Sequence, residues 1–181
     1  VPRAFAPEYV LPHGGGEIKL VDFGMGKAAA KTQDTQSGAL KGKLLYMSPE
    51  QAWGRPDIDN RSDLYAAAII LWELLAGRRL YNGDSEMGIL DKVREALVPD
   101  ISEFNPEVTP ELAEILNRSL AKERDDRYGD ARQFQNELEA QLTKEYGEAP
   151  SSVWVLSALH GLFPSAYRHE GDPRPVRRPV P

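Results

Sequence analysis

Residues 64–76 constrain the fold more than any other part of the sequence. Their apolar side chains recur at helical spacing, and most of the positions between them are apolar as well. A helix that is apolar on nearly every side must be covered by other elements, because a surface helix keeps a polar face. Glu73 interrupts the run, which is also shorter than the ~20 apolar residues that span a bilayer. The sequence therefore predicts a central, buried helix and no membrane span.

Composition narrows the class of protein further. The 181 residues suit one domain with a tail, and the net charge of −6 argues against a nucleic-acid partner, which would require clustered Lys and Arg. The absence of cysteine excludes disulfides, thiolate metal sites and cysteine nucleophiles, and is compatible with a reducing compartment. The first residues lack the basic patch and apolar run of a signal peptide. We therefore expect a cytoplasmic protein.

The remaining periodicities predict a mainly α fold. Residues 9–11 and 17–21 are expected to form a small β-hairpin, with Ile18 and Leu20 on a half-buried face. Residues 25–47 have no clear period and are expected to form a long loop. Beside the central helix, which Gly77 is expected to end, helices are predicted at 84–97, from Thr109, from Asp130 and within 151–163. The expected architecture is a small β-hairpin, a long loop and about five helices around the buried one.

Four motifs follow one another in a characteristic order. The sequence D-F-G stands at 22–24, Y-M-S-P-E at 46–50 and R-S-D at 61–63, and Arg127 follows two aspartates late in the chain. A lone D-F-G is a weak signal, but the ordered set resembles the protein kinase family. The similarity is to the C-terminal lobe of a bacterial serine/threonine kinase. It covers residues 1–145, with an additional short helix expected in 146–171 and a Pro- and Arg-rich disordered tail at 172–181.

The resemblance implies roles for particular residues. Asp22 would hold Mg²⁺ against the phosphates of ATP, since hard oxygen ligands suit that ion. Glu50 and Arg127 would form a buried ion pair, and Asp63 would steady the backbone of the catalytic loop. The remaining cofactor-binding positions would be Leu11, Phe23 and Gly24. Without the resemblance, Asp22 could be a strand-end turn residue, Arg127 a surface charge and Asp63 a carboxylate at a helix N-terminus.

The segment that should carry catalysis departs from the family pattern. With the usual spacing to D-F-G, Ala4 stands at the position of the catalytic Asp and Tyr9 at that of the metal-binding Asn. Alanine cannot accept a proton, and tyrosine is a poor ligand for Mg²⁺. The alternative is a different register in this short segment, although Arg3 and Pro7 agree with the register used. The printed sequence also contains no G-x-G-x-x-G and no V-A-I-K, so we expect weak or absent binding of ATP and Mg²⁺.

Three hypotheses for function follow. The chain is an inactive kinase-family module that binds partners in signalling through its late helices, a piece of an active kinase whose N-terminal lobe lies on another stretch of chain, or a decayed gene product. Thr32, Thr35 and Ser37 are candidate phosphorylation sites in what would be the activation loop, with a solvated polar loop as the alternative. Leu71, Leu74 and Leu75 are expected to form an incompletely covered patch, so that the protein self-associates or folds residues 151–163 over it.

Overall fold

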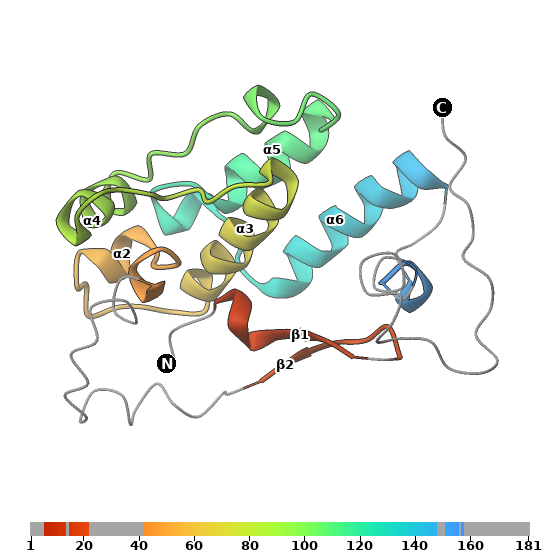
Figure 1. Ribbon diagram of the computed structural model, residues 1–181, viewed down its shortest axis with the longest axis horizontal. Helices are drawn as coiled ribbons and strands as arrows, with labels where there is room; N and C mark the ends of the chain where they lie inside the picture. The colour runs from red at the N-terminus through yellow and green to blue at the C-terminus, as the bar shows by residue number, and fades with distance from the viewer. Residues whose placement is uncertain (1–5, 14, 22–41, 148–150, 156, 158–181) are drawn as a thin grey trace.

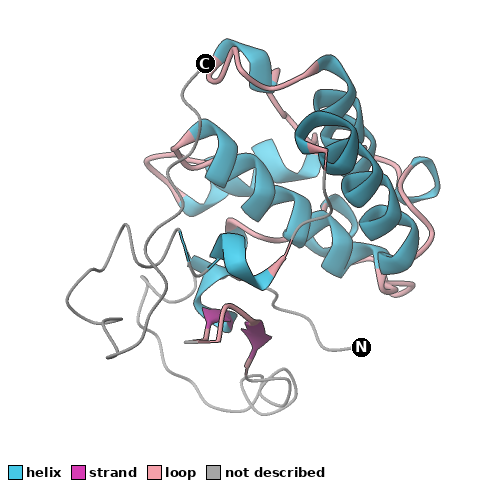
Figure 2. Cartoon of the chain, turned by 90° about the vertical axis from the view of Figure 1, so that its right-hand side faces the viewer, coloured by secondary structure: helices cyan, strands magenta, loops and turns pink. Residues whose placement is uncertain are grey.

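The computed structural model describes residues 6–13, 15–21, 42–147, 151–155 and 157. Helices make up most of this part of the chain, and the two strands pair into one small antiparallel sheet at its edge (Figures 1 and 2). None of the described helices is both long and apolar enough to cross a membrane. The predicted mainly α fold with a β-hairpin is confirmed. The elements, in chain order, are η1 (Pro7–Tyr9), β1 (Val10–Pro12), β2 (Ile18–Leu20), α2 (Pro49–Ala52), α3 (Arg61–Ala76), α4 (Glu86–Arg94), η2 (Ile101–Glu103), α5 (Pro110–Ser119), η3 (Arg124–Asp126) and α6 (Ala131–Tyr146).

Helix α3 is the predicted central helix, and its side chains form the middle of the core. Tyr65, Ile69 and Trp72 are almost completely buried. Gly77 ends the helix in the left-handed conformation (φ 65°), which a residue without a Cβ adopts at little cost, and its N–H bonds to the Glu73 carbonyl. Leu74 is 76% exposed. It departs from a helix that is covered on every side, and it agrees with the expected incompletely covered patch.

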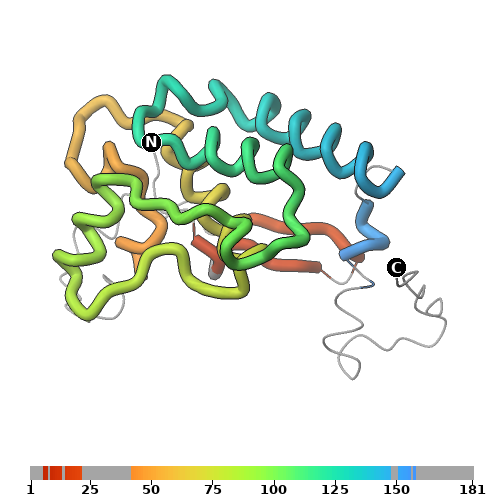
Figure 3. The backbone as a smooth tube through the Cα atoms, turned by 90° about the horizontal axis from the view of Figure 1, so that it is seen from above, coloured from red at the N-terminus to blue at the C-terminus, as the bar shows by residue number. Residues whose placement is uncertain are grey.

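The later elements pack around α3 in two groups. Helix α5 lies against α3 on one side and against α6 on the other, and α6 runs beside α5 (Figure 3). Helix α4 packs on α2, and η2 contacts α3. These elements and the segment before α4 contribute large, fully buried side chains to the same core as α3, namely Tyr81, Ile89, Ile101 and Leu116.

Two predicted helix starts are confirmed by their caps. The Thr109 hydroxyl accepts a hydrogen bond from the Leu112 N–H at 3.3 Å, where α5 begins. The Asp130 carboxylate accepts one from the Gln133 N–H at 2.9 Å, where α6 begins. Both side chains satisfy N–H groups that have no partner inside the helix, which is why these residue types predict helix starts.

Helix α4 is shorter than predicted. It ends at Arg94 rather than near residue 97, and Leu97, expected on the inner face, is 59% exposed. Ala96 takes a positive φ of 47°, and the Leu97 N–H bonds back to the Lys92 carbonyl. This is the hydrogen bond of a Schellman helix end, which usually has Gly at the left-handed position. Because alanine stands at that position, no local signal marks the end of the helix in the sequence.

The β-hairpin has the expected antiparallel pairing but not the expected burial. Val10 pairs with Leu20 and Pro12 with Ile18. Ile18 and Leu20, predicted to face the core, are 52% and 41% exposed. Alternation along a strand predicts which side chains share a face, but another element must cover that face before it is buried. No described element buries it here.

Two helical segments border regions outside the described residues. Residues 42–44, within the predicted long loop, are helical, and α2 follows them where only a motif had been recognised. The start of α2 is a capping box, in which the Gln51 side chain accepts a hydrogen bond from the Ser48 N–H at 2.9 Å. Residues 152–155 are helical within the predicted 151–163 helix, and Trp154 packs edge-on against Tyr146 of α6.

Candidate functional site

Tyr9 stands at the position where the family has a metal-binding Asn. The hairpin places it beside the strand that leads to D-F-G. Tyr9 ends η1, is partly buried and packs against the core. The N–H of Val21 donates a hydrogen bond of 2.9 Å to the Tyr9 carbonyl, which continues the ladder of β1 and β2 by one residue. Asp22 is the next residue after Val21. The register therefore sets residue 9 opposite the end of the strand from which Asp22 follows.

The described residues do not provide a magnesium site at this place. Tyr9 offers a phenol, whereas Mg²⁺ is held in proteins by carboxylate, carbonyl and water oxygens. No group of three or more His, Cys, Asp or Glu side chains in the described part of the chain is placed to hold a metal ion. Leu11, predicted to contact the nucleotide, lies on β1 and is 46% exposed.

Several predicted site residues lie outside the described residues, so their roles stay predictions. They comprise the position of the catalytic base, the D-F-G motif and the three candidate phosphorylation sites: Ala4, Asp22, Phe23, Gly24, Thr32, Thr35 and Ser37.

Glu50 and Arg127 form a buried, bidentate ion pair. The two guanidinium NH groups of Arg127 donate hydrogen bonds of 2.9 and 2.8 Å to the two carboxylate oxygens of Glu50. Each residue is only 3% exposed. The Ser62 hydroxyl, at the start of α3, donates a third hydrogen bond of 2.6 Å to the Glu50 carboxylate. The carboxylate at the start of α2 is thus tied both to α3 and to the segment that leads into α6.

The remaining hydrogen-bonding capacity of Arg127 is largely used by backbone carbonyls. Its Nε donates to the Ala121 carbonyl at 2.8 Å, and one NH group donates to the Lys122 carbonyl at 3.0 Å. Its guanidinium also lies over the Tyr65 ring, 4.6 Å from the centroid. A buried cation with this many partners can fix the backbone around it, which suits a structural role.

The ion pair determines the charge state of Glu50. Burial by itself raises the pKa of the Glu50 carboxyl, but the hydrogen bonds from Arg127 and Ser62 and the positive charge of Arg127 outweigh it. The pKa is lowered to about 2. Glu50 therefore stays ionised at neutral pH inside the core.

Two parts of this network were missed by the sequence analysis. The Ser62 hydroxyl bond to Glu50 was not anticipated, although Ser62 stands beside Asp63 in a recognised motif. The Tyr65 hydroxyl meets the Tyr81 hydroxyl at 2.6 Å in the core, and burial raises the pKa of Tyr65. A tyrosine within an apolar run needs a polar partner when it is buried, and that rule could have identified Tyr65 as part of a network.

A second contact fastens the end of the long loop to α3. The Tyr46 hydroxyl donates a hydrogen bond of 2.8 Å to the Glu73 carboxylate, which also accepts one from the Leu80 N–H at 3.1 Å. Arg79 pairs with the same carboxylate at 3.0 Å. Burial raises the pKa of Glu73. The polar residue that interrupts the apolar run of α3 thus joins two neighbouring segments.

Asp63 lies in the first turn of α3 and is partly buried. The catalytic-loop residues that it is predicted to steady, 1–5, lie outside the described residues. Its role therefore stays a prediction, whereas the predicted pairing of Glu50 with Arg127 is present in the structure.

The helical body around α3, the hairpin that leads to D-F-G and the buried Glu50–Arg127 pair define a kinase-type lobe. The family model for the protein kinase domain matches residues 6–138. The chain belongs to the protein kinase family, and its curated relatives support the serine/threonine type.

Three of these relatives show how much of the chain is shared. The chain is 36% identical over 138 residues to the probable serine/threonine-protein kinase PknB of Lactococcus lactis, covering 76% of this chain and 22% of that protein. It is 35% identical over 160 residues to PknB of Mycolicibacterium smegmatis, covering 87% and 25%. It is 36% identical over 140 residues to PknL of Mycobacterium tuberculosis, covering 77% and 35%. The matched region thus spans between about a fifth and a third of these relatives.

Proposed function

We propose that this chain is a partial protein kinase domain that does not transfer phosphate by itself and acts as a binding module in signalling. The observation that carries the proposal is the hairpin register. It sets Tyr9 opposite Val21, immediately before Asp22, at the position where the family has a metal-binding Asn. Ala4 stands at the position of the catalytic base. Phosphoryl transfer needs both the base and the metal-binding Asn, and neither alanine nor tyrosine can take these roles.

The buried Glu50–Arg127 pair supports a chain that keeps the kinase fold but does not transfer phosphate. Glu50 and Arg127 keep a bidentate pair with full burial, and Ser62 adds a further hydrogen bond. These groups hold helices together inside the core. A chain that keeps them while losing catalytic groups can still present the surfaces of its late helices, α5 and α6, to partners.

The proposed setting is cytoplasmic, where ATP and a reducing environment are found, and the cysteine-free composition is compatible with it. ATP and Mg²⁺ are the family's cofactors, and ATP is the phosphate donor that Mg²⁺ positions. We propose that binding of both is weak or absent in this chain, since Asp22 would be the one family metal ligand left.

A thermal-shift titration tests this part of the proposal. A ligand at a free concentration of 100 times its Kd stabilises the folded state by about 2.7 kcal/mol, which is easily detected. We expect no shift with ATP and Mg²⁺ at concentrations that saturate a complete kinase, and no difference between the chain and its Asp22→Ala variant. A clear shift that disappears in Asp22→Ala would overturn this expectation.

The coverage of the relatives supports a second candidate function. The match spans only 22% to 35% of three curated kinases. As the alternative, we therefore propose that the chain is a piece of an active kinase. The coding sequence immediately upstream discriminates the two. A Gly-rich loop and a V-A-I-K lysine there, in frame or after a frameshift, would favour the piece of an active kinase. Their absence would favour the binding module or a decayed gene product.

A further inference from the structure

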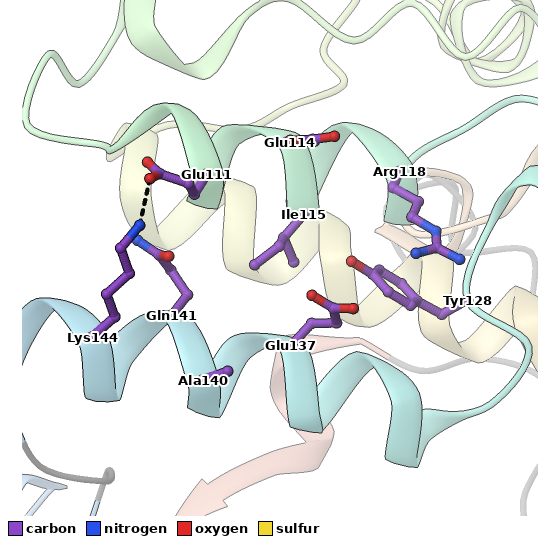
Figure 4. A pocket seen from close by; sticks show the side chains of 9 residues that line it. All are labelled: Glu111, Glu114, Ile115, Arg118, Tyr128, Glu137, Ala140, Gln141 and Lys144. Carbon is purple, nitrogen blue, oxygen red and sulfur yellow. Dashed lines mark hydrogen bonds and ion pairs between the residues drawn. The ribbon is translucent and has the colours of Figure 1, made fainter.

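Helices α5 and α6 enclose a groove that the kinase role does not use. Its volume is about 410 Å³. Ile115 and the ring of Tyr128, which are 7% and 3% exposed, are its most deeply buried lining side chains, and ionisable side chains line both walls (Figure 4). The groove therefore combines a sheltered apolar floor with charged walls, as sites for an amphipathic ligand do.

The ionisable side chains of the groove fall into two sets. At one end Lys144 of α6 pairs with Glu111 of α5 at 2.7 Å. At the other end the Arg118 guanidinium lies over the Tyr128 ring, 4.2 Å from its centroid. These contacts account for both cations that line the groove.

Two carboxylates in the groove remain without a partner. Glu114 lines it from α5 and Glu137 from α6; both are exposed, and among the described residues neither carboxylate forms an ion pair or a side-chain hydrogen bond. Burial and then the charge of Glu137 raise the pKa of Tyr128, whereas the charge and the hydrogen bond of Arg118 lower it. With three glutamates against two cations, the groove is net negative.

The hydroxyl of Tyr128 opens onto the groove. It points toward Glu137 (Figure 4) and accepts a side-chain hydrogen bond from Arg118. A hydroxyl both accepts and donates, so its proton can also be donated to a ligand. A ligand with a carbonyl oxygen would supply the acceptor.

These features select the chemistry of the ligand. The net negative walls disfavour a phosphate or a nucleotide, and a metal ion would need more free oxygen ligands than the two unpaired carboxylates provide. A guanidinium on an alkyl stem fits better. Its planar fork can bind carboxylates on both walls, its stem can lie on Ile115, and a peptide carbonyl can accept from Tyr128.

We propose that this α5–α6 groove binds an extended peptide segment of a partner protein that presents an arginine side chain between Glu114 and Glu137. The inference rests on the proposed function, since it names the partner class of a binding module that uses its late helices.

The test is an NMR titration of the full ¹⁵N-labelled chain with the acetylated, amidated peptide Ala-Ala-Arg-Ala-Ala. The control peptide carries citrulline, which has the same shape as arginine and no charge. We expect saturable shifts concentrated at amides of α5 and α6 that flank the groove, and at least fivefold weaker binding of the citrulline peptide.

Matched variants separate the groove from general electrostatics. Glu114→Gln and Glu137→Gln should each weaken arginine-peptide binding at least fivefold. Glu145→Gln removes the same charge from α6 outside the groove and should leave binding unchanged. Tyr128→Phe, which removes only the hydroxyl, should weaken the arginine and citrulline peptides by the same factor.

The proposal is overturned if the groove amides do not shift, if the two peptides bind equally well, or if Glu145→Gln weakens binding as much as Glu137→Gln. None of these results bears on phosphate transfer. A negative result for peptide binding therefore leaves the proposed lack of phosphate transfer untouched, because the nucleotide experiments test that proposal separately.

Discussion

Glu50 and Arg127 lie 77 positions apart in the sequence and meet through two parallel hydrogen bonds of 2.9 and 2.8 Å in the core. One residue belongs to α2, directly after the long loop, and the other follows η3. The pair therefore closes the helical body around the start of α3. Because each partner compensates a buried charge of the other, the pair should be far more sensitive to the loss of one member than a surface ion pair.

Glu50→Gln should destabilise the protein by about 3–5 kcal/mol, because it leaves the guanidinium of Arg127 buried without a counter-charge. The measurement is urea unfolding followed by circular dichroism. Glu123→Gln is the control, since Glu123 pairs with Arg55 at an exposed site, where ion pairs contribute about 0–1 kcal/mol. Equal losses in the free energy of unfolding for the two substitutions would show that the buried pair contributes no more than an exposed one.

Stability should fall on acidification through the same carboxyl. The folded-state pKa of Glu50 is about 2, against 4.5 for the free side chain, so the unfolded state binds a proton first as the pH drops. The stabilisation is complete above pH 4.5 and is lost progressively toward pH 2, by about 3 kcal/mol in total. Urea unfolding at a series of pH values between 5 and 2.5 measures this slope.

Glu50→Gln should reduce the acid slope without abolishing it. Hydrogen bonds from Ser102 and from Lys144 lower the pKa values of Asp100 and Glu111 respectively, so these groups contribute in the same direction. Glu73 contributes in the opposite direction, because burial raises its pKa and its stabilising effect is lost as the pH rises. An identical slope in the wild-type chain and in Glu50→Gln would contradict the assignment.

The exposed side chain of Leu74 should promote self-association. It is 76% exposed on α3, while the neighbouring Leu71 and Leu75 are only partly buried. Light scattering should show association in the wild-type chain and less in Leu74→Ser, with stability changed by less than about 0.5 kcal/mol. Met87→Ser, at an exposed apolar side chain of α4, is the matched control. A monodisperse wild-type monomer that binds no hydrophobic dye would rule out such a patch.

Local signals in the sequence predicted the parts of the fold that depend on a few neighbouring residues. Gly77, Thr109 and Asp130 mark helix ends correctly because each cap satisfies backbone groups within its own turn. The end of α4 at Arg94 was missed because Ala96, rather than glycine, takes the left-handed conformation. The exposure of Ile18 was missed because burial depends on what covers a strand.

The candidate site depended on different information. No periodicity connects Glu50 with Arg127, so their pairing was accessible only through the resemblance to a family. The hydrogen bond from Ser62 and the stacking of Tyr65 on the guanidinium depend on how α3 is turned within the core, which one sequence does not specify. The α5–α6 groove likewise arises from helix packing, since its two unpaired carboxylates lie on different helices.

A phosphotransfer assay tests the central claim most directly. The purified chain is incubated with radiolabelled ATP, Mg²⁺ and a generic protein acceptor, and incorporated label is measured beside a complete serine/threonine kinase. The account predicts no transfer to itself or to the acceptor, and none in the Ala4→Asp, Tyr9→Asn double variant, because the printed sequence has no Gly-rich loop or lysine to clamp the phosphates. Phosphorylation that is abolished by Asp22→Ala would contradict the account.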